Sequence, residues 1–367
     1  MRKYLAVTAC VLFASAMAAQ SPLAKELSVP AYSTEDLKST GPNGEPAASA
    51  MSLELTAEDR QKLKDGKFKV AFAFHMLSNE MTTTELAAIK DTFNELGVEL
   101  VGVTDAQMKV ETQVSNIESL MALQPDLLLS TPIDPISTAA SYRAAAEQGA
   151  KLVFVENIAH GMVAGKDYVS CIAADNYGNG VAAADIMAEA IGGEGEVGVV
   201  FFDANFWVTD QRAEGFKDRI AEKYPNIKVV AEGGFTDQNR VTEVVDGILV
   251  NHPQIDGIFA VWDIPAEGTI AAAKSAGRGD LIVTTIDLGA NAARIIAEDG
   301  MIKGLGAQRP YDQGVAIATT AAYALIDKKA PEFVAVPPLP VVRANLLKAW
   351  EEAYHEPAPD NIAELMK

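Results

Sequence analysis

The stretch 256–277, "DGIFAVWDIPAEGTIAAAKSAG", shows how this chain is built. Residues 258–261 form a continuous apolar run of strand length, and a helix-like segment opens at Pro265. Trp262 and Asp263 stand side by side where the predicted strand ends. This pair is compatible with packing and a helix cap, and equally with a ligand site. Whether the pair packs or binds a ligand depends on what the rest of the chain places near it.

The same alternation of short apolar runs and amphipathic segments repeats along the chain from Phe68. Continuous apolar strands separated by helices predict parallel βαβ units whose sheets are covered on both faces. The units are too many for one sheet of usual size, and 367 residues are long for a single domain. The predicted fold class is therefore α/β, with two doubly wound, Rossmann-like lobes of parallel sheet.

The segment 82–96 illustrates the predicted helices. Leu86, Ile89, Phe93 and Leu96 share one face at helical spacing, and Gly97 stands where the helix should stop. In the same way Asp175, directly before a helical pattern, is typical of an N-cap.

The chain is strongly acidic, with a formal net charge of −20. No basic stripe offsets this charge, so binding to nucleic acid through phosphate contacts is excluded. The acidity and the lack of a helix-turn-helix start also argue against a transcription regulator.

The first residues, "MRKYLAVTACVLFASAMAAQ", have a positive start, an apolar run and small residues after it. This layout predicts a signal peptide over 1–19 and a chain exported to the bacterial periplasm. A lipid anchor at Cys10 is the less favoured alternative, because the apolar run continues beyond it to Phe13. After cleavage only Cys171 remains, so no intramolecular disulfide can form.

Two segments fall outside the βαβ pattern. Residues 20–67 form a polar extension, in which "STGPNGEPAAS" (39–49) is rich in turn residues, and we expect it to be mobile. The C-terminal tail, 346–367, carries an apolar stripe of helical spacing that we expect to dock on the body of the protein. The stripe consists of Leu346, Leu347, Trp350 and Tyr354.

Polar and aromatic side chains follow the ends of the predicted strands, where open parallel sheets bind ligands. Amide, carboxylate and guanidinium groups suit ligands with many hydroxyls, and flat rings suit their C–H faces. Any one such residue is more often a loop former or a helix cap, so the set counts for more than its members. The set includes His75, Asn79, Glu156, Asn157, Trp207, Trp262, Asp263, Asp287 and Gln308.

The sequence carries none of the common catalytic motifs. The four histidines have no metal-ligand spacing, and neither a G-x-S-x-G elbow nor a P-loop is present. The glycine-rich "GGEGEVG" (192–198) precedes a strand, so it ends a helix and does not bind a dinucleotide. The sequence therefore predicts no enzyme, no metal site and no cofactor.

Several segments, in order, resemble the type I periplasmic binding proteins, specifically the ribose-binding-like group that serves ABC sugar importers. The resemblance runs from Phe68 to Ala344 and includes "LLLSTPIDP", "CIAADNYGNGVAAADIM", "QRAEGF" and "GLGAQRPYDQG". It implies a two-lobed clamp with three crossovers that closes on a small sugar. Lobe one would hold 68–174 plus 309–334, and lobe two would hold 175–308 plus 335–345.

The resemblance also implies which residues bind the ligand. Glu156 falls where many members have an aspartate, Asn157 where an arginine is frequent, and either Asp210 or Arg212 at a lobe-two arginine. The remaining matched positions are Asn79, Asp263, Asp287 and Gln308.

Three departures from the family pattern bear on selectivity. Met81 and Thr82 replace frequent aromatics, and Trp262 stands where an asparagine is frequent, while Trp207 adds aromatic surface in lobe two. The preferred ligand is then expected to be not ribose but another pentose, a deoxy sugar or a short polyol.

The predicted function is that of a monomeric periplasmic solute-binding protein that delivers a monosaccharide or short polyol to an ABC permease. The first alternative is a periplasmic receptor that passes a bound sugar or autoinducer-like ligand to a membrane sensor. The second is an exported α/β enzyme that processes carbohydrate.

Overall fold

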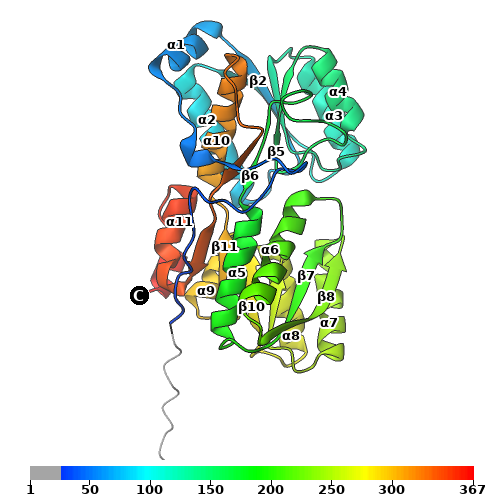
Figure 1. Ribbon diagram of the computed structural model, residues 1–367, viewed down its shortest axis with the longest axis vertical. Helices are drawn as coiled ribbons and strands as arrows, with labels where there is room; N and C mark the ends of the chain where they lie inside the picture. The colour runs from blue at the N-terminus through cyan, green and yellow to red at the C-terminus, as the bar shows by residue number, and fades with distance from the viewer. Residues whose placement is uncertain (1–25) are drawn as a thin grey trace, which may run out of the picture.

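A computed structural model describes residues 26–367; the expected signal peptide and Cys10 lie outside the described residues. The chain forms two α/β lobes, one above the other in Figure 1, and the connecting segments run between them. Within 26–367, no helix combines the length and apolar character needed to cross a membrane.

Lobe one is built on a seven-stranded parallel sheet with the order β1-β12-β6-β5-β4-β2-β3. Its central strands are mainly apolar and buried because helices cover both faces of the sheet. The strands are β1 (Ala48–Ser49), β2 (Lys69–Phe74), β3 (Glu99–Asp105), β4 (Leu127–Ser130), β5 (Lys151–Val155), β6 (Ser170–Ala174) and β12 (Phe333–Val336).

Two separate apolar cores lie on the two faces of this sheet. One face packs against α1 (Ala57–Gly66), α2 (Glu80–Leu96) and α10 (Pro310–Leu325). The other face packs against α3 (Val110–Met121) and α4 (Ala139–Glu147). The helix α2 ends at Gly97, whose φ of 70° is the left-handed conformation expected for a helix stop.

Lobe two has a six-stranded sheet with the order β13-β11-β10-β9-β7-β8. Its strands are β7 (Gly195–Phe202), β8 (Ile227–Phe235), β9 (Gly257–Ala260), β10 (Ile282–Ile286), β11 (Ile302–Ala307) and β13 (Leu339–Val342). The helices that pack against it are α5 (Asn176–Ala190), α6 (Trp207–Lys223), α7 (Val241–Asn251), α8 (Asp263–Ser275) and α9 (Ala290–Ala297). Short 3₁₀ turns occupy η1 (Ala50–Ser52), η2 (Gln238–Arg240) and η3 (Arg343–Asn345).

After residue 68, three segments cross between the lobes, namely β6 to α5, β11 to α10, and β12 to β13. The third crossover has no helix, so β13 enters lobe two antiparallel to β11 and the second sheet is mixed. The strand β12 continues to Val336, two residues past the expected boundary of lobe one at 334. The predicted fold class of two doubly wound α/β lobes is confirmed.

The N-terminal segment 26–49, here called the strap, lies along lobe two and ends in the sheet of lobe one (Figure 1). The expectation that 39–49 is mobile was wrong. Ser39 is 3% exposed, and its backbone N–H and hydroxyl both donate to Asp175 at 2.8 Å. Asp175 caps α5 at the first crossover, so one carboxylate joins the strap to the hinge.

The tail docks on lobe two. Helix α11 (Leu346–Tyr354) buries Leu346, Trp350 and Tyr354 in the core of that lobe, and the short α12 (Asp360–Leu365) follows it. The Tyr354 hydroxyl donates to the carbonyl of Leu288 at 2.6 Å. Helix α11 also faces the start of α10. Nη2 of Arg309, the residue before α10, lies 3.3 Å from Oε2 of Glu352 on α11.

Candidate functional site

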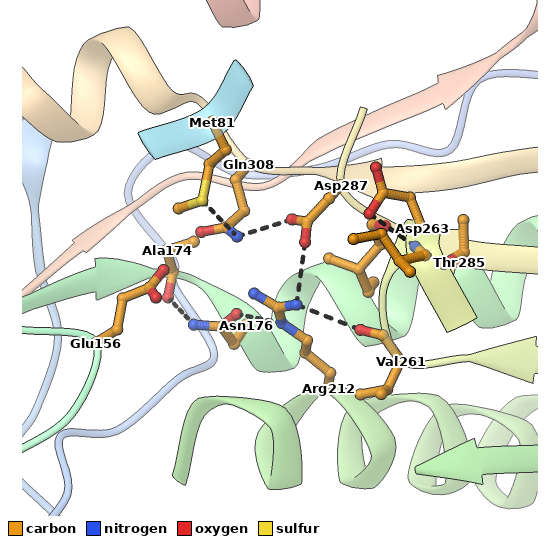
Figure 2. Close-up of polar contacts among 12 residues, drawn as sticks. Met81, Glu156, Ala174, Asn176, Arg212, Val261, Asp263, Thr285, Asp287 and Gln308 are labelled. Carbon is orange, nitrogen blue, oxygen red and sulfur yellow. Dashed lines mark hydrogen bonds and ion pairs between the residues drawn. The ribbon is translucent and has the colours of Figure 1, made fainter. Parts of the chain in front are cut away.

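Three polar side chains of the lobe-two edge meet at the lobe boundary (Figure 2). Asp287 follows β10, Gln308 follows β11, and Arg212 comes from the second turn of α6. The Asp287 carboxylate accepts from Gln308 Nε2 at 2.7 Å and from Arg212 Nη1 at 3.3 Å. We call these residues, with Met81, Glu156 and Asn176, the interlobe cluster.

Arg212 is 4% exposed and is held on three sides. Its Nε donates to Asn176 Oδ1 at 2.8 Å, and its Nη1 donates to the carbonyl of Val261 at 3.3 Å as well as to Asp287. Helix α6 approaches α5 closely, because a Cβ at Gly180 would overlap the Arg212 carbonyl oxygen. The backbone of Arg212 is therefore fixed by helix packing, and its guanidinium by hydrogen bonds.

Glu156 is the lobe-one carboxylate of the cluster. It follows β5 with φ of 59° and is 5% exposed. Burial raises the pKa of Glu156, the facing Arg212 opposes that rise, and Asp287 adds to it. Lobe one also supplies Met81, whose sulfur lies 3.9 Å from Gln308 Nε2.

Asp263, the first residue of α8, lies beside Asp287. Its Oδ1 accepts from the N–H of Ile264 at 2.9 Å, and a Cβ at Gly289 would overlap its carboxylate. Burial, and then the charge of Asp287, raises the pKa of Asp263 to about 8. Glu80 of lobe one contributes to the same rise, so Asp263 faces the lobe boundary.

The side chains of two other predicted site residues make local hydrogen bonds. Asn79 caps α2, where its Oδ1 accepts from both the N–H and the hydroxyl of Thr82 at 2.9 Å. Asn157 donates to the carbonyl of Pro132 at 3.0 Å and accepts from the N–H of Ile158. Asn157 therefore joins the loops after β4 and β5.

His75 lies directly after β2, and no hydrogen bond or ion pair among residues 26–367 joins its side chain to the interlobe cluster. Its Nδ1 is buried and has no partner among the described residues. Burial lowers the pKa of His75 to about 4, against the opposing effect of Asp105. The ring is therefore neutral at physiological pH.

The remaining predicted residues lie outside the cluster. Asp210 is exposed on α6, so of the pair Asp210 and Arg212 only the arginine points to Asp287. Trp207 packs edge-on against Phe333 across the lobe boundary, with ring centroids 5.5 Å apart. Trp262 packs edge-on against Phe202 and Phe235 of lobe two, at 5.5 and 5.1 Å.

Two buried residues behind Glu156 were missed from the sequence. Gln313 of α10 donates to Glu85 of α2 at 3.2 Å and to Glu156 at 3.4 Å. A signal existed, since Glu85 precedes Ile89, Phe93 and Leu96 on one apolar helix face, where a carboxylate is out of place.

The cluster and its neighbour Asp263 are rich in acceptors. They bring the carboxylates of Glu156 and Asp287 to one guanidinium, and the carboxyl of Asp263 lies beside Asp287. The carbonyl oxygen of the Gln308 side chain is buried and has no donor among the described residues. Such a set favours a neutral ligand that donates several hydrogen bonds and disfavours an anion. In residues 26–367 no group of His, Cys, Asp and Glu is arranged to hold a metal ion.

A comparison with family models matches residues 70–330 to the periplasmic binding protein domain. The chain belongs to this family. The match extends from β2 through α10 and includes the first two crossovers, while β1, β12, β13 and the third crossover lie outside it. It confirms the resemblance drawn from the sequence. It also agrees with the prediction of a binding protein and not an enzyme.

The relatives found are sugar- and polyol-binding proteins. The ribose import binding protein of Escherichia coli is 25% identical over 74% of this chain and 89% of its own. The xylitol-binding protein of Mycolicibacterium smegmatis is 27% identical over 66% of this chain and 68% of its own. A solute-binding protein of Actinobacillus succinogenes, solved with bound D-allose, has a TM-score of 0.66 and 26% identity, covering 76% of this chain and 99% of that one.

Proposed function

We propose that this protein is the periplasmic solute-binding component of an ABC importer, and that it binds a neutral monosaccharide or short polyol between its lobes. The observation that carries the proposal is the meeting of Glu156 from lobe one with Arg212 and Asp287 from lobe two. Each ligand hydroxyl can donate to a carboxylate and accept from the guanidinium or an amide. The relatives named above bind ligands of this class.

The ligand is proposed to stabilise the closed arrangement of the lobes. Both lobes contribute polar groups, so a ligand that contacts both favours closure over opening by the difference in its contacts. The three crossovers provide the hinge for this motion. The closed form would then be the one recognised by the permease, as a monomer.

Export is the second part of the proposal. The leader over residues 1–19 would direct the chain to the periplasm, in keeping with the compartment of the family. Comparing the N-terminal residue of the protein secreted by its native host with the predicted cleavage site would test this.

The test of function is a thermal-shift screen with D-ribose, D-arabinose, D-allose, xylitol and myo-inositol, with gluconate as an anionic control. A ligand present at 100 times its Kd adds about 2.7 kcal/mol to stability, and therefore raises Tm by several degrees. We expect a rise with at least one neutral compound and none with gluconate. No rise with any of them, together with turnover of a glycoside, would contradict the proposal and favour the enzyme alternative.

A further inference from the structure

A buried group of three polar side chains lies behind the interlobe cluster in lobe one. Glu85 of α2 is 2% exposed, Gln313 of α10 is 0% exposed, and Glu156 is 5% exposed. Two carboxyl groups and one amide in an apolar core are costly unless each finds a partner. The burial of these three side chains therefore indicates that they have a role in the protein beyond packing.

The packing of α2 on α10 creates the contact. Gly314 lets the two helices approach, since a Cβ there would overlap the carbonyl oxygen of Glu85 and the side chain of Ala88. The neighbouring Gln313 then donates through Nε2 to Glu85 Oε2 at 3.2 Å and to Glu156 Oε1 at 3.4 Å. One amide group thus ties the Glu156 carboxylate to a helix pair.

The charges of the group can be assigned. Burial and the charge of Glu156 raise the pKa of Glu85 well above its ordinary value, and Gln313 only partly opposes them. Glu156 differs because the Arg212 guanidinium of lobe two faces it. Among the described residues no cation acts on Glu85 in this way, so of the two carboxyls Glu85 holds its proton more firmly.

We propose that Glu85 and Gln313 are positioning residues that hold the Glu156 carboxylate toward lobe two, where it accepts a ligand hydroxyl. The ligand contact of Glu156 rests on the proposed function. The neutral state of Glu85 does not depend on that function. Glu85 does not touch the ligand; it acts in its neutral form through Gln313. A charged Glu85 would repel Glu156 and compete with it for the same amide hydrogens.

The first test needs no ligand and compares Tm of the wild type and Glu85→Gln from pH 4.5 to pH 8. Because the folded protein holds the Glu85 proton and the unfolded chain loses it above about pH 4.3, wild-type stability falls as pH rises. The variant lacks this loss. We expect Tm of E85Q minus Tm of the wild type to grow by several degrees across the range. A difference in Tm between the two proteins that does not change with pH would show that Glu85 is not neutral in the folded protein.

The second test measures the Kd for D-ribose, D-allose and xylitol by calorimetry. For each compound that the wild type binds, Gln313→Leu should weaken binding about tenfold or more, since the carboxylate loses its hydrogen bond. E85Q should stay within about threefold, because it imitates the neutral acid. The control is Thr320→Val, a buried hydroxyl further along α10 without a partner among the described residues, and its Kd should match the wild type.

The outcomes separate the two proposals. Wild-type affinity in Q313L, or a tenfold loss in E85Q, would overturn the positioning role. If Q313L does not fold, Gln313→Asn, which is one methylene shorter, replaces it with the same expectation. If the wild type binds none of the three compounds and fails the wider screen, the proposed function falls and the ligand role of Glu156 falls with it. The pH series still decides separately whether Glu85 is neutral.

Discussion

Glu156 and Asp287 occupy matching places in the two lobes, each directly after a central strand. Both have positive φ, 59° and 71°, which is uncommon for residues other than glycine. Such conformations cost of order 1–3 kcal/mol and persist only where the surroundings enforce them. Each lobe therefore turns its strand end sharply and places a carboxylate in the interlobe cluster. Arg212 is the group that balances them.

Replacing Arg212 tests this balance. Arg212→Met should destabilise the ligand-free protein by about 3–5 kcal/mol, because the buried Glu156 and the partly buried Asp287 lose their cation. Denaturant unfolding would measure the loss, and calorimetry should find sugar binding abolished. Arg219→Met on the same helix is the matched control, since Arg219 is 30% exposed and its partner Asp185 keeps Lys223 and the Tyr224 hydroxyl as partners. The control should cost about 1 kcal/mol or less and leave ligand affinity unchanged. Equal losses in the two variants would contradict the account.

The raised pKa of Asp263 makes a pH prediction. A folded pKa of about 8 against an unfolded value near 3.9 means that its contribution to stability is full below pH 4 and is lost as pH rises toward 8. Asp263→Asn should therefore gain on the wild type over that range, by up to about 5 kcal/mol at pH 8. Tm measured at pH 4, 6 and 8 checks this, with the exposed Asp246→Asn as control. Parallel Tm curves would rule it out.

At the scale of elements, the crossing of α5 over α6 positions the cluster. Gly180 of α5 meets the carbonyl of Arg212, and Gly215 of α6 meets the carbonyl of Tyr177. These two glycines let the helix backbones touch, so Arg212 reaches the crossover residue Asn176. Helix α6 is therefore placed by backbone contact and not by an apolar stripe alone.

Gly180→Ala is expected to push α6 away from α5. The overlap should cost about 1–3 kcal/mol of stability and weaken ligand binding, because Arg212 moves with its helix. Gly247→Ala on α7 is the control, since no atom lies near its added Cβ. That control should raise stability by about 0.5–1 kcal/mol through helix propensity. Unfolding curves and a crystal structure of G180A would decide; an unmoved α6 with unchanged affinity would refute the expectation.

Elements with local signals were predictable from the sequence. Gly97 ends α2, Asp175 caps α5, and Gly192 and Gly193 end α5 with positive φ, because each of these events depends on a few neighbouring residues. The strand-end rule also indicated the positions of Asp287, Glu156 and Gln308. The rule could not indicate Glu85 or Gln313, since their meeting depends on how α2 and α10 are rotated against each other. The rule also could not decide whether the Asn79 side chain caps a helix or binds a ligand.

At the scale of the whole molecule, the strap and the tail brace the lobe boundary. The strap contacts Asp175 at the first crossover and Gln211 of α6, and its Tyr32 hydroxyl contacts Arg309 at the second crossover. The sequence did not reveal this, because composition marked 39–49 as turn-rich while its partners lie far along the chain. The strap therefore favours one arrangement of the lobes.

Ser39→Ala tests the strap. The Ser39 hydroxyl donates to Asp175 at 2.8 Å and accepts from the N–H of Tyr177 at 3.0 Å. Its loss leaves buried partners unsatisfied and should cost about 1–3 kcal/mol. Small-angle scattering of the ligand-free protein should also show a larger radius of gyration. Ser33→Ala is the control, since the Ser33 hydroxyl accepts only from the strap's own N–H groups of Glu35 and Asp36, and it should leave the radius of gyration unchanged. A compact, fully stable S39A would contradict the bracing role.

The pairing of β1 with β12 also has a consequence for the order of folding. These strands lie near opposite ends of the described chain, so β1 is synthesised early and β12 late. Helix α10 and strand β13 are also synthesised late. The sheet of lobe one lacks β12 and a covering helix until the C-terminal region exists, so contacts of high sequence separation must form last. A nascent chain should stay protease-sensitive for most of its length and gain resistance only near completion. The strap, first to be made, is then among the last segments to find its place.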